Sequence, residues 1–516
     1  MRGARRGRPD PPAATRSSWR CSVVLSACLS LATAAPAAAP VPAAQPGAPT
    51  TAFVAGLEAR LPSWLQRYGV PGVAVSLVVD GKPVWSGAFG HADAATHRPL
   101  TTDAVFRAES ISKSVTARGV MTLVERGLVA LDDPVQAHLR TWEPPVPEAR
   151  RGAITVGRLL SGTAGLALGR VGEEYEPGAP LPSLRRHLTE EFRLVAEPGA
   201  RFSYSNVGYA LLELLVEDVT GRSFADYMRD EVLRPLGMGR ATFDWSDVEP
   251  GALPTGHDLN GRAVPAYVYP ALAAGGLYAT VDDLARFVAA EVGAAAAGPV
   301  LALHVPRAEV RGAYGLVADG YAAGRFTEVL ADGRTAVWHG GQGHGWMSHF
   351  HAVPAAGVGI VILTNSQRSW PLMAELLDLW AGWQGLGPLG MSKITSATRA
   401  LTALTALLWL GTAWGTARLV VDARAGRRGW RSLRGPGAAW RWGRLVVATV
   451  TLWGLAWAAL QPYLMLQAVF PGAAGRAAWA LAAGAVVIGA TAIVPVSRRE
   501  VARPAAAPAT ATSSTA

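Results

Sequence analysis

Three long apolar stretches in the C-terminal part of the 516-residue chain restrict its fold more than any other feature. They cover about residues 400–421, 445–469 and 477–496, and each is close to the roughly 20 residues that a helix needs to cross a bilayer. Burial inside a soluble domain is the alternative, but this region contains nothing else to cover them. We therefore predict a three-helix transmembrane region over 393–499, followed by a disordered tail over 500–516.

Charge is distributed unevenly along the chain. Residues 51–392 contain 28 Lys and Arg against 35 Asp and Glu, a net charge of −7, whereas the two ends together carry +17. The mildly acidic central part gives no reason to expect a nucleic-acid partner. Arginines cluster between the first two apolar stretches and follow the third, and positive residues stay on the cytoplasmic side of a membrane. We therefore predict a multi-pass cell-membrane protein with an extracytoplasmic central domain and a cytoplasmic C-terminus.

The N-terminal residues predict the same orientation. Six arginines lie before or at Arg20, an apolar run covers 21–32, and small residues follow, which is the order of an export signal. The sequence Leu25-Ser26-Ala27-Cys28 also resembles a bacterial lipobox, so cleavage after an alanine and acylation of Cys28 both remain open. We predict a signal peptide at 1–35 and an Ala- and Pro-rich linker at 36–50. Because both cysteines lie in this signal, the 51–392 domain has no disulfide and no thiol nucleophile.

The 51–392 domain has strand patterns at both ends and helical patterns between them. Strand patterns cover 72–79, 82–90, 336–339, 346–353 and 357–364, with a further signal near Tyr314. Asp80-Gly81 is a favoured hairpin turn between the first two strands. Helical patterns are at 51–68, 110–126, 206–220, 224–233 and 371–383. We predict a two-part α/β (α+β) fold, a sheet domain plus an all-α part, with a cleft between them.

A hydroxyl and an amine sit at a chemically useful spacing in Phe106-Arg107-Ala108-Glu109-Ser110-Ile111-Ser112-Lys113. If a helix begins at Ser110, Lys113 lies one turn later on the same face. A serine becomes a nucleophile when a neighbouring base takes its proton, and a lysine can do this when its neutral form is accessible. The chain uses only three lysines, Lys82, Lys113 and Lys393, among many arginines. Ser110 and Lys113 are therefore candidates for an acyl-transfer pair.

Two further motifs follow in order, Tyr204-Ser205-Asn206 and His339-Gly340-Gly341. With the Ser110/Lys113 pair, their order and spacing resemble the serine β-lactamase and penicillin-binding-protein superfamily, in particular its class C-like branch of β-lactamases, esterases and D-amino-acid peptidases. The resemblance covers about residues 53–383. It implies a β-lactamase-like fold, with an antiparallel sheet flanked by helices beside an all-α subdomain, and a serine hydrolase that needs no metal or cofactor.

The resemblance also implies a role for each site residue. Ser110 is the nucleophile that forms an acyl-enzyme, and Lys113 is its partner in proton transfer. Tyr204 is the general base, a phenol held as phenolate by nearby cations, and Asn206 bonds Lys113 or the substrate amide. His339 stands where many members carry the lysine of a Lys-Thr-Gly motif. In the oxyanion hole, the N–H groups of Ser110 and Gln342 bind the oxygen, and Gly340 and Gly341 let substrate lie against the strand edge.

Two features of the sequence qualify this interpretation. Glu109 precedes the nucleophile where a small residue is usual, and its carboxylate raises the pKa of Lys113 and Tyr204 if it stays charged. His339 in place of lysine reduces the fixed positive charge available to a β-lactam carboxylate. The cluster of His339, His344, His349 and His351 offers a metal site as a less favoured alternative.

We therefore predict a membrane-anchored extracytoplasmic serine hydrolase for small-molecule or peptide substrates, with ester or amide bonds, including peptidoglycan-type or β-lactam amides. An esterase or D-amino-acid peptidase is favoured over a potent β-lactamase. The alternative is a catalytically silent sensor or binding module for cell-wall fragments. One sequence gives no information about the oligomeric state or the natural substrate.

Overall fold

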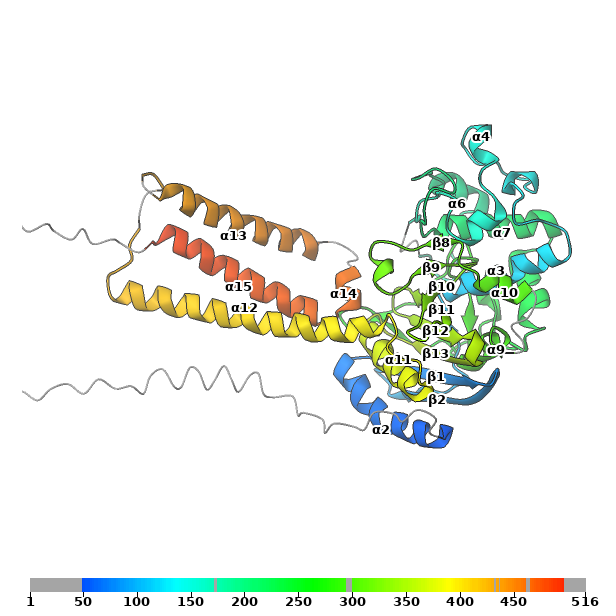
Figure 1. Ribbon diagram of the computed structural model, residues 1–516, viewed down its shortest axis with the longest axis horizontal. Coiled ribbons are helices and arrows are strands. Elements are labelled where there is room, and N and C mark those ends of the chain that lie inside the picture. Colours follow the sequence, from blue (N-terminus) through cyan, green and yellow to red (C-terminus); the bar gives the residue numbers. More distant parts are fainter. Residues whose placement is uncertain are drawn as a thin grey trace, which may run out of the picture. The chain divides into compact units, whose positions relative to one another are not determined.

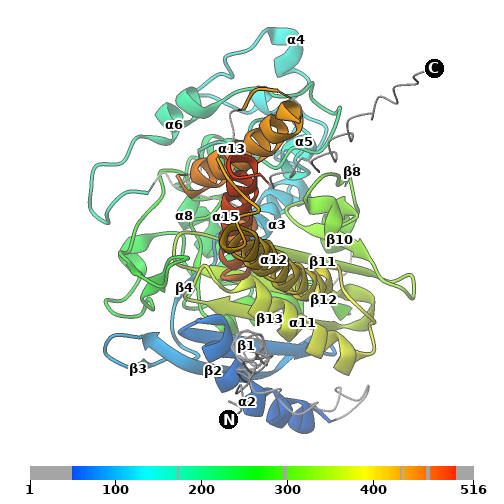
Figure 2. The same cartoon turned by 90° about the vertical axis from the view of Figure 1, so that its left-hand side faces the viewer.

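The computed structural model describes residues 49–170, 174–293, 299–430, 433–435, 437–460 and 465–495. The predicted signal peptide, nearly all of the linker, and the tail lie outside the described residues. Within the described part, nine strands form one antiparallel sheet. In sheet order these are β3 (Arg98–Pro99), β2 (Lys82–Asp93), β1 (Gly72–Val79), β13 (Val358–Thr364), β12 (Met347–Val353), β11 (Thr335–Gln342), β10 (Phe326–Val329), β9 (Gly320–Tyr321) and β8 (Ala308–Glu309), as Figures 1 and 2 show.

The predicted hairpin opens this sheet. Asp80 and Gly81 have φ values of 51° and 69°, the left-handed conformation that a tight two-residue hairpin turn requires. Strand β1 then pairs with β13, so that the first and last parts of the domain meet in the middle of the sheet. The helical residues between them form an insertion, which confirms the predicted two-part fold.

Alternating side chains of the sheet fill two separate cores. On β1, Val73, Val75 and Leu77 face the first core with helices α2 (Thr50–Tyr68) and α11 (Trp370–Gln384). Ala74 and Val78 face the second core, which holds α9 (Val281–Ala290) and the helical insertion. This alternation follows from the two-residue repeat of a strand. Both faces of the sheet are therefore covered by helices (Figure 1).

The helical insertion lies mainly between β1–β2 and β8. Its helices are α3 (Ile111–Glu125), α4 (Glu148–Arg151), α5 (Val156–Leu160), α6 (Leu184–Glu191), α7 (Asn206–Thr220), α8 (Phe224–Met228) with a π-helical continuation at Arg229–Leu233, α9, and α10 (Pro299–His304). Two small sheets complete this part, β4 (Phe106–Arg107) with β7 (Tyr278–Ala279) and β5 (Gly256–His257) with β6 (Ala263–Val264).

One local prediction differs from the structure. The segment near Tyr314 is a 3₁₀ turn, Tyr314–Leu316, and the strands nearby are the two-residue β8 and β9. In the predicted second span at 445–469, helix α13 covers Ala438–Ala459 and a short helix, α14, covers Met465–Val469. Residues 461–464 between these helices lie outside the described residues.

Among the residues that the structure describes, three helices are long and apolar enough to cross a membrane: α12 (Ser392–Arg424), α13 and α15 (Ala473–Ile493). Helix α15 packs against both α12 and α13, as Figure 1 shows. Its buried contact residues are small, among them Ala477, Ala480 and Ala485, which lets the helices approach closely. Large apolar side chains point outward instead, including Trp414 and Trp453. Exposed apolar surface of this kind fits an apolar solvent and suggests association with a membrane.

Candidate active site

The predicted nucleophile stands at the start of a buried helix. Ser110 is the N-cap residue of α3, and Lys113 follows one turn later on the same face. The Lys113 Nζ and Ser110 Oγ atoms are 3.1 Å apart, a hydrogen-bond distance. The structure therefore brings these two groups together as the sequence predicted.

Lys113 is enclosed by carbonyl and aromatic groups. Its Nζ donates to the Ala274 carbonyl oxygen at 2.7 Å and lies 4.9 Å from the ring centre of Tyr204 and 5.6 Å from that of Tyr209. Burial lowers the pKa of Lys113 to about 7, although the charge of Glu109 opposes the shift. The amine is therefore able to gain and lose a proton near neutral pH.

Tyr204 reaches the same point from the segment before α7. Its hydroxyl is hydrogen-bonded to Ser110, so the serine contacts both a lysine and a tyrosine. Burial raises the pKa of Tyr204 well above its ordinary value, with Tyr314 adding to the shift and the Ser110 hydrogen bond opposing it. The free protein therefore holds Tyr204 as a phenol. The phenolate that the resemblance implied stays a prediction, and the burial of Tyr204 argues against it.

His339 lies beside these groups on strand β11. Its Nδ1–H donates to the Gly340 carbonyl at 2.9 Å, which leaves Nε2 as an acceptor for the Tyr321 hydroxyl at 3.4 Å. Burial, with a smaller contribution from Lys113, lowers the pKa of His339 to about 3. The imidazole is therefore neutral, and this position provides no fixed positive charge.

The two glycines after His339 are required by packing within the protein. A Cβ atom on Gly340 would lie 2.6 Å from the Trp370 ring, and one on Gly341 would lie 2.4 Å from the Ala108 carbonyl oxygen. Strand β11 thereby comes within contact distance of the residues that precede Ser110. Gln342 ends the strand, and its side-chain oxygen accepts a hydrogen bond from Trp370 Nε1 at 3.1 Å.

Asn206 is the first residue of α7, two positions after Tyr204, and its backbone N–H donates to Leu168. The resemblance implied a bond from its side chain to Lys113 or to the substrate amide. In the described part of the chain, the hydrogen bonds of the Lys113 amine go to Ser110 and Ala274 instead. Contact between Asn206 and a substrate stays a prediction.

The sequence did not reveal the residue that holds the hydrogen-bond acceptor of Lys113 in place. The carboxylate of Glu213, on α7, accepts the N–H groups of Leu272 and Ala273 at 2.6 and 2.8 Å, which fixes the loop that presents the Ala274 carbonyl. Burial raises the pKa of Glu213 to about 8, although these two hydrogen bonds oppose the shift. A glutamate within an apolar helical stretch was the signal that could have revealed it.

The four histidines of the C-terminal strands do not converge. His339 pairs with Phe350, and His349 pairs with Gly340, so the two histidines face opposite sides of the sheet. His349 and His351 share a face as predicted, 3.5 Å apart at their closest nitrogens. His344 is in a loop and contacts Glu174. Among the residues with described positions, no group of three His, Cys, Asp or Glu side chains is arranged to hold a metal.

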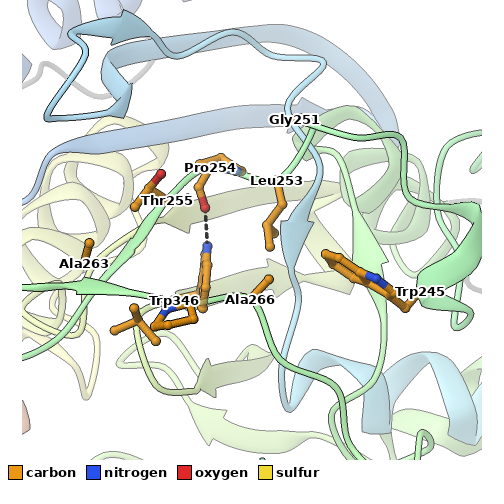
Figure 3. Close-up of a pocket in the computed structure, with 10 residues that line it drawn as sticks. Trp245, Gly251, Leu253, Pro254, Thr255, Ala263, Ala266 and Trp346 are labelled. Atoms are coloured by element: carbon orange, nitrogen blue, oxygen red, sulfur yellow. Dashed lines mark hydrogen bonds between the residues drawn. The ribbon is translucent and has the colours of Figure 1, made fainter. Parts of the chain in front are cut away.

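A separate open hollow includes Trp346, whose ring lies 5.7 Å from that of Tyr267. Figure 3 shows its lining, which includes Trp245, Leu253, Pro254, Ala266 and Trp346. Trp346 Nε1 donates to the Pro254 carbonyl at 2.9 Å across one wall. No predicted site residue lines this hollow.

The fold agrees with comparisons to known proteins. Residues 51–381 match the β-lactamase family model, so this chain belongs to the β-lactamase family, in its serine-hydrolase type. The chain is 29% identical over 327 residues to penicillin-binding protein 4 of Amycolatopsis lactamdurans, covering 60% of this chain and 84% of that one. It is 28% identical over 385 residues to esterase EstB of Burkholderia gladioli, covering 63% and 95% respectively.

A solved structure shows the same fold. The octameric penicillin-binding-protein homologue from Pyrococcus abyssi has a TM-score of 0.57 and 26% identity, over 67% of this chain and 81% of that one. The predicted superfamily, fold and serine-hydrolase class are thus confirmed.

Proposed function

We propose that this protein is a membrane-anchored hydrolase that cleaves an ester or amide outside the cytoplasm through an acyl-Ser110 intermediate. The observation that carries the proposal is the double contact of the Ser110 hydroxyl, with the Lys113 amine at 3.1 Å and with the Tyr204 phenol. A serine held between an amine of lowered pKa and a phenol is arranged for nucleophilic attack.

The reaction begins with neutral Lys113 as the base. As Ser110 Oγ bonds to the substrate carbonyl carbon, its proton passes to Lys113 Nζ, and the N–H groups of Ser110 and Gln342 stabilise the carbonyl oxygen as it becomes negative. The Tyr204 phenol gives its proton to the leaving alcohol or amine as the carbon–oxygen or carbon–nitrogen bond breaks, and Lys113 re-protonates Tyr204. A water molecule then cleaves the acyl-serine ester by the reverse proton transfers, releasing the acid.

An ester or an uncharged amide is the substrate class that the site supports best. Because His339 is neutral, the site lacks the fixed cation that would attract a carboxylate at that position. This favours an esterase or peptidase over a potent β-lactamase. Similarity to an esterase supports the same choice. We expect faster turnover of a p-nitrophenyl ester than of a chromogenic cephalosporin in parallel assays.

A fluorophosphonate probe tests the acyl-serine proposal directly. The wild-type protein in detergent is expected to be labelled, and Ser110→Ala to lose the label. Ser112→Ala is the matched control, because its hydroxyl accepts the Leu277 N–H instead of facing Lys113. Absence of any Ser110-dependent label would favour a silent binding module. The sequence-based argument for such a module was the charge of Glu109 beside the nucleophile. In the structure this charge is compensated, because Arg107 forms an ion pair with Glu109 at 2.7 Å.

The membrane topology is part of the proposal. We propose a hydrolase domain at 51–392 and a transmembrane region at 393–499, preceded by the export signal at 1–35. Arg428 and Arg441 donate to carbonyls at the C-terminal end of α15, Val494 and Ala492, which supports placing the arginine-rich segment and this end on one, cytoplasmic, side. Alkaline phosphatase fused at the C-terminus is expected to be inactive, and an active fusion would contradict this orientation.

A further inference from the structure

The residue before the nucleophile has an unusual backbone. Glu109 has a φ of 49°, in the left-handed region that residues other than glycine rarely adopt. Its carbonyl oxygen accepts the Ser112 N–H at 2.8 Å and therefore points along the start of α3. Because the peptide bond is planar and trans, the Ser110 N–H of the same peptide unit points the opposite way, out of the helix. The conformation of Glu109 thus sets the direction of the Ser110 N–H.

The side chain of Glu109 is held at both oxygens. Its Oε1 accepts from Arg107 Nε at 2.7 Å and from the Tyr267 hydroxyl at 3.1 Å, and its Oε2 accepts from the Tyr269 hydroxyl at 2.9 Å. The side chains of Arg107 and Glu109 are 1% and 3% exposed. A buried carboxylate with three charge-assisted partners has little freedom to rotate.

Arg107 is fixed in turn by the same aromatic segment. Its Nη1 donates to the Tyr267 carbonyl at 2.6 Å and to the Tyr278 hydroxyl at 2.7 Å. The guanidinium carbon lies 3.9 Å from the centre of the Tyr267 ring, a cation–π contact. The ion pair therefore ties the turn at Glu109 to residues about 160 positions later in the chain.

The other side of Glu109 is closed by the end of β11 and the loop after it. A Cβ atom on Gly343 would lie 2.2 Å from Glu109 Oε1, and one on Gly341 would lie 2.8 Å from Glu109 Cβ. Glycine at both positions makes room for this glutamate. Behind Tyr267, the Trp346 ring lies 5.7 Å away and forms part of the hollow in Figure 3. Glu109 therefore lies between the end of β11 with its following loop on one side and Arg107, Tyr267 and Tyr269 on the other.

We propose that Glu109 is a positioning residue: held by Arg107, Tyr267 and Tyr269, it maintains the left-handed turn that aims the hydroxyl and N–H of Ser110 at the substrate carbonyl. This inference rests on the proposed acyl-Ser110 chemistry. The ion pair acts through the geometry of Ser110 and does not itself touch the substrate.

The charge of Glu109 provides a second readout. The titratable groups that face Lys113 are Glu109, Tyr204, Tyr209 and His339. Burial keeps the tyrosines and the histidine neutral, so Glu109 is the carboxylate whose charge raises the pKa of Lys113 against the effect of burial. Neutralising Glu109 therefore lowers the pKa of Lys113, and the acidic limb of the kcat/KM profile moves to lower pH.

The experiment uses the full-length protein in detergent and hydrolysis of p-nitrophenyl acetate. Glu109→Gln keeps the shape of the side chain and is expected to keep kcat within about threefold, while its acidic limb moves down by about half a pH unit. Arg107→Met/Glu109→Ala removes both charges, so no unpaired cation is left behind. Its kcat is expected to fall by about 100-fold with KM changed by less than about threefold.

Circular dichroism and thermal unfolding establish that each variant is folded. If the double variant does not fold, Glu109→Gln alone tests the inference, through the position of its acidic limb and its kcat. A folded double variant with kcat within about threefold of wild type, or an acidic limb that Glu109→Gln leaves unmoved, overturns the inference. Absence of Ser110-dependent turnover in the wild type overturns the proposed function itself, which is a different result.

Discussion

The two sides of the central sheet at β11 and β12 both bury histidine, yet they use it differently. On one side His339 has a partner at each ring nitrogen and stands beside Lys113 and Tyr204. On the other side His349 and His351 lie among tryptophans, and His349 Nδ1 and His351 Nε2 have no hydrogen-bond partner among the described residues. Burial lowers the pKa of both His339 and His349 to about 3.

A perturbed pKa therefore does not distinguish the two sides. Loss of solvent shifts an imidazole in the same direction whether or not chemistry takes place beside it. What distinguishes the His339 side is the Ser110 hydroxyl, the Lys113 amine and the Tyr204 phenol within contact distance, the groups of the proposed active site. On the opposite side, His349 and His351 lie against the rings of tryptophans in a packed apolar core, so we expect substitutions there to leave turnover nearly unchanged.

The largest effect is expected at Lys113. Lys113→Met removes the proposed base while keeping a side chain of similar length, so kcat/KM for a p-nitrophenyl ester is expected to fall by about 10³-fold or more. The fold should persist, because a buried amine is replaced by an apolar group. Steady-state kinetics and a thermal unfolding curve check both points. Retention of more than about a tenth of the wild-type rate would show that another group takes the Ser110 proton.

The pH profile is expected to show the next largest effect. In the proposed mechanism only neutral Lys113 accepts the serine proton, and the pKa of Lys113 is lowered to about 7. The neutral fraction falls about tenfold for each pH unit below that value, so kcat/KM should rise with pH and level off above about 7. A profile measured from pH 5 to 9 with a neutral ester checks this. A rate that stays flat down to pH 5 contradicts it.

Glu213 tests how the His339 side is supported. Glu213→Leu leaves the Leu272 and Ala273 N–H groups without their acceptor and loosens the Ala274 carbonyl that bonds Lys113, so we expect kcat to fall about tenfold. Glu213→Gln keeps an acceptor oxygen and is the matched control, with kcat near wild type. Equal losses in the two variants would point to the carboxyl group itself.

Glu213 also gives a stability prediction with a defined sign. Its pKa in the folded protein, about 8, lies above the ordinary value of 4.5, so the folded state binds the proton more tightly. The stability contributed by this proton is fully present below about pH 4.5 and is lost as pH rises through 8. The Tm of wild type should therefore fall more steeply over that pH window than the Tm of Glu213→Gln. Parallel plots of Tm against pH for the two proteins would refute the assignment.

The smallest effect is expected on the far side of the sheet. His349→Phe replaces a ring that has an unpaired buried nitrogen with an apolar ring of similar size. We expect kcat/KM within about twofold of wild type and an unfolding free energy changed by less than about 1 kcal/mol, because the hydrogen bond that is lost, between His349 Nε2 and His351 Nδ1, is long at 3.5 Å. Urea unfolding and the ester assay measure both. A large loss of turnover would erase the distinction between the two sides.

Local patterns in the sequence were sufficient for the elements that depend on short-range geometry. The dipeptide Asp80-Gly81 predicted the hairpin because only certain residues tolerate left-handed turns. Ser110 and Lys113 were predicted to meet because three positions along a helix make nearly one turn. The apolar spans were predicted by length and composition, and three helices long and apolar enough to cross a membrane are found among the described residues.

Groups that act through distant partners could not be assigned from the sequence. From the sequence, a charged Glu109 was expected to raise the pKa of Lys113 and Tyr204. The sequence did not show that folding places Arg107, Tyr267 and Tyr269 around this carboxylate. Tyr204 was expected as a phenolate, but its pKa depends on how much solvent the fold removes.

By itself, the amino-acid sequence determined the order of the motifs, the antiparallel two-part architecture through its resemblance to a family, and the apolar spans. Tertiary structure alone decided which buried charges are compensated and which side chains keep their protons. The reason is physical: hydrogen-bond geometry and desolvation depend on distances between residues far apart in the chain, and sequence spacing does not specify those distances.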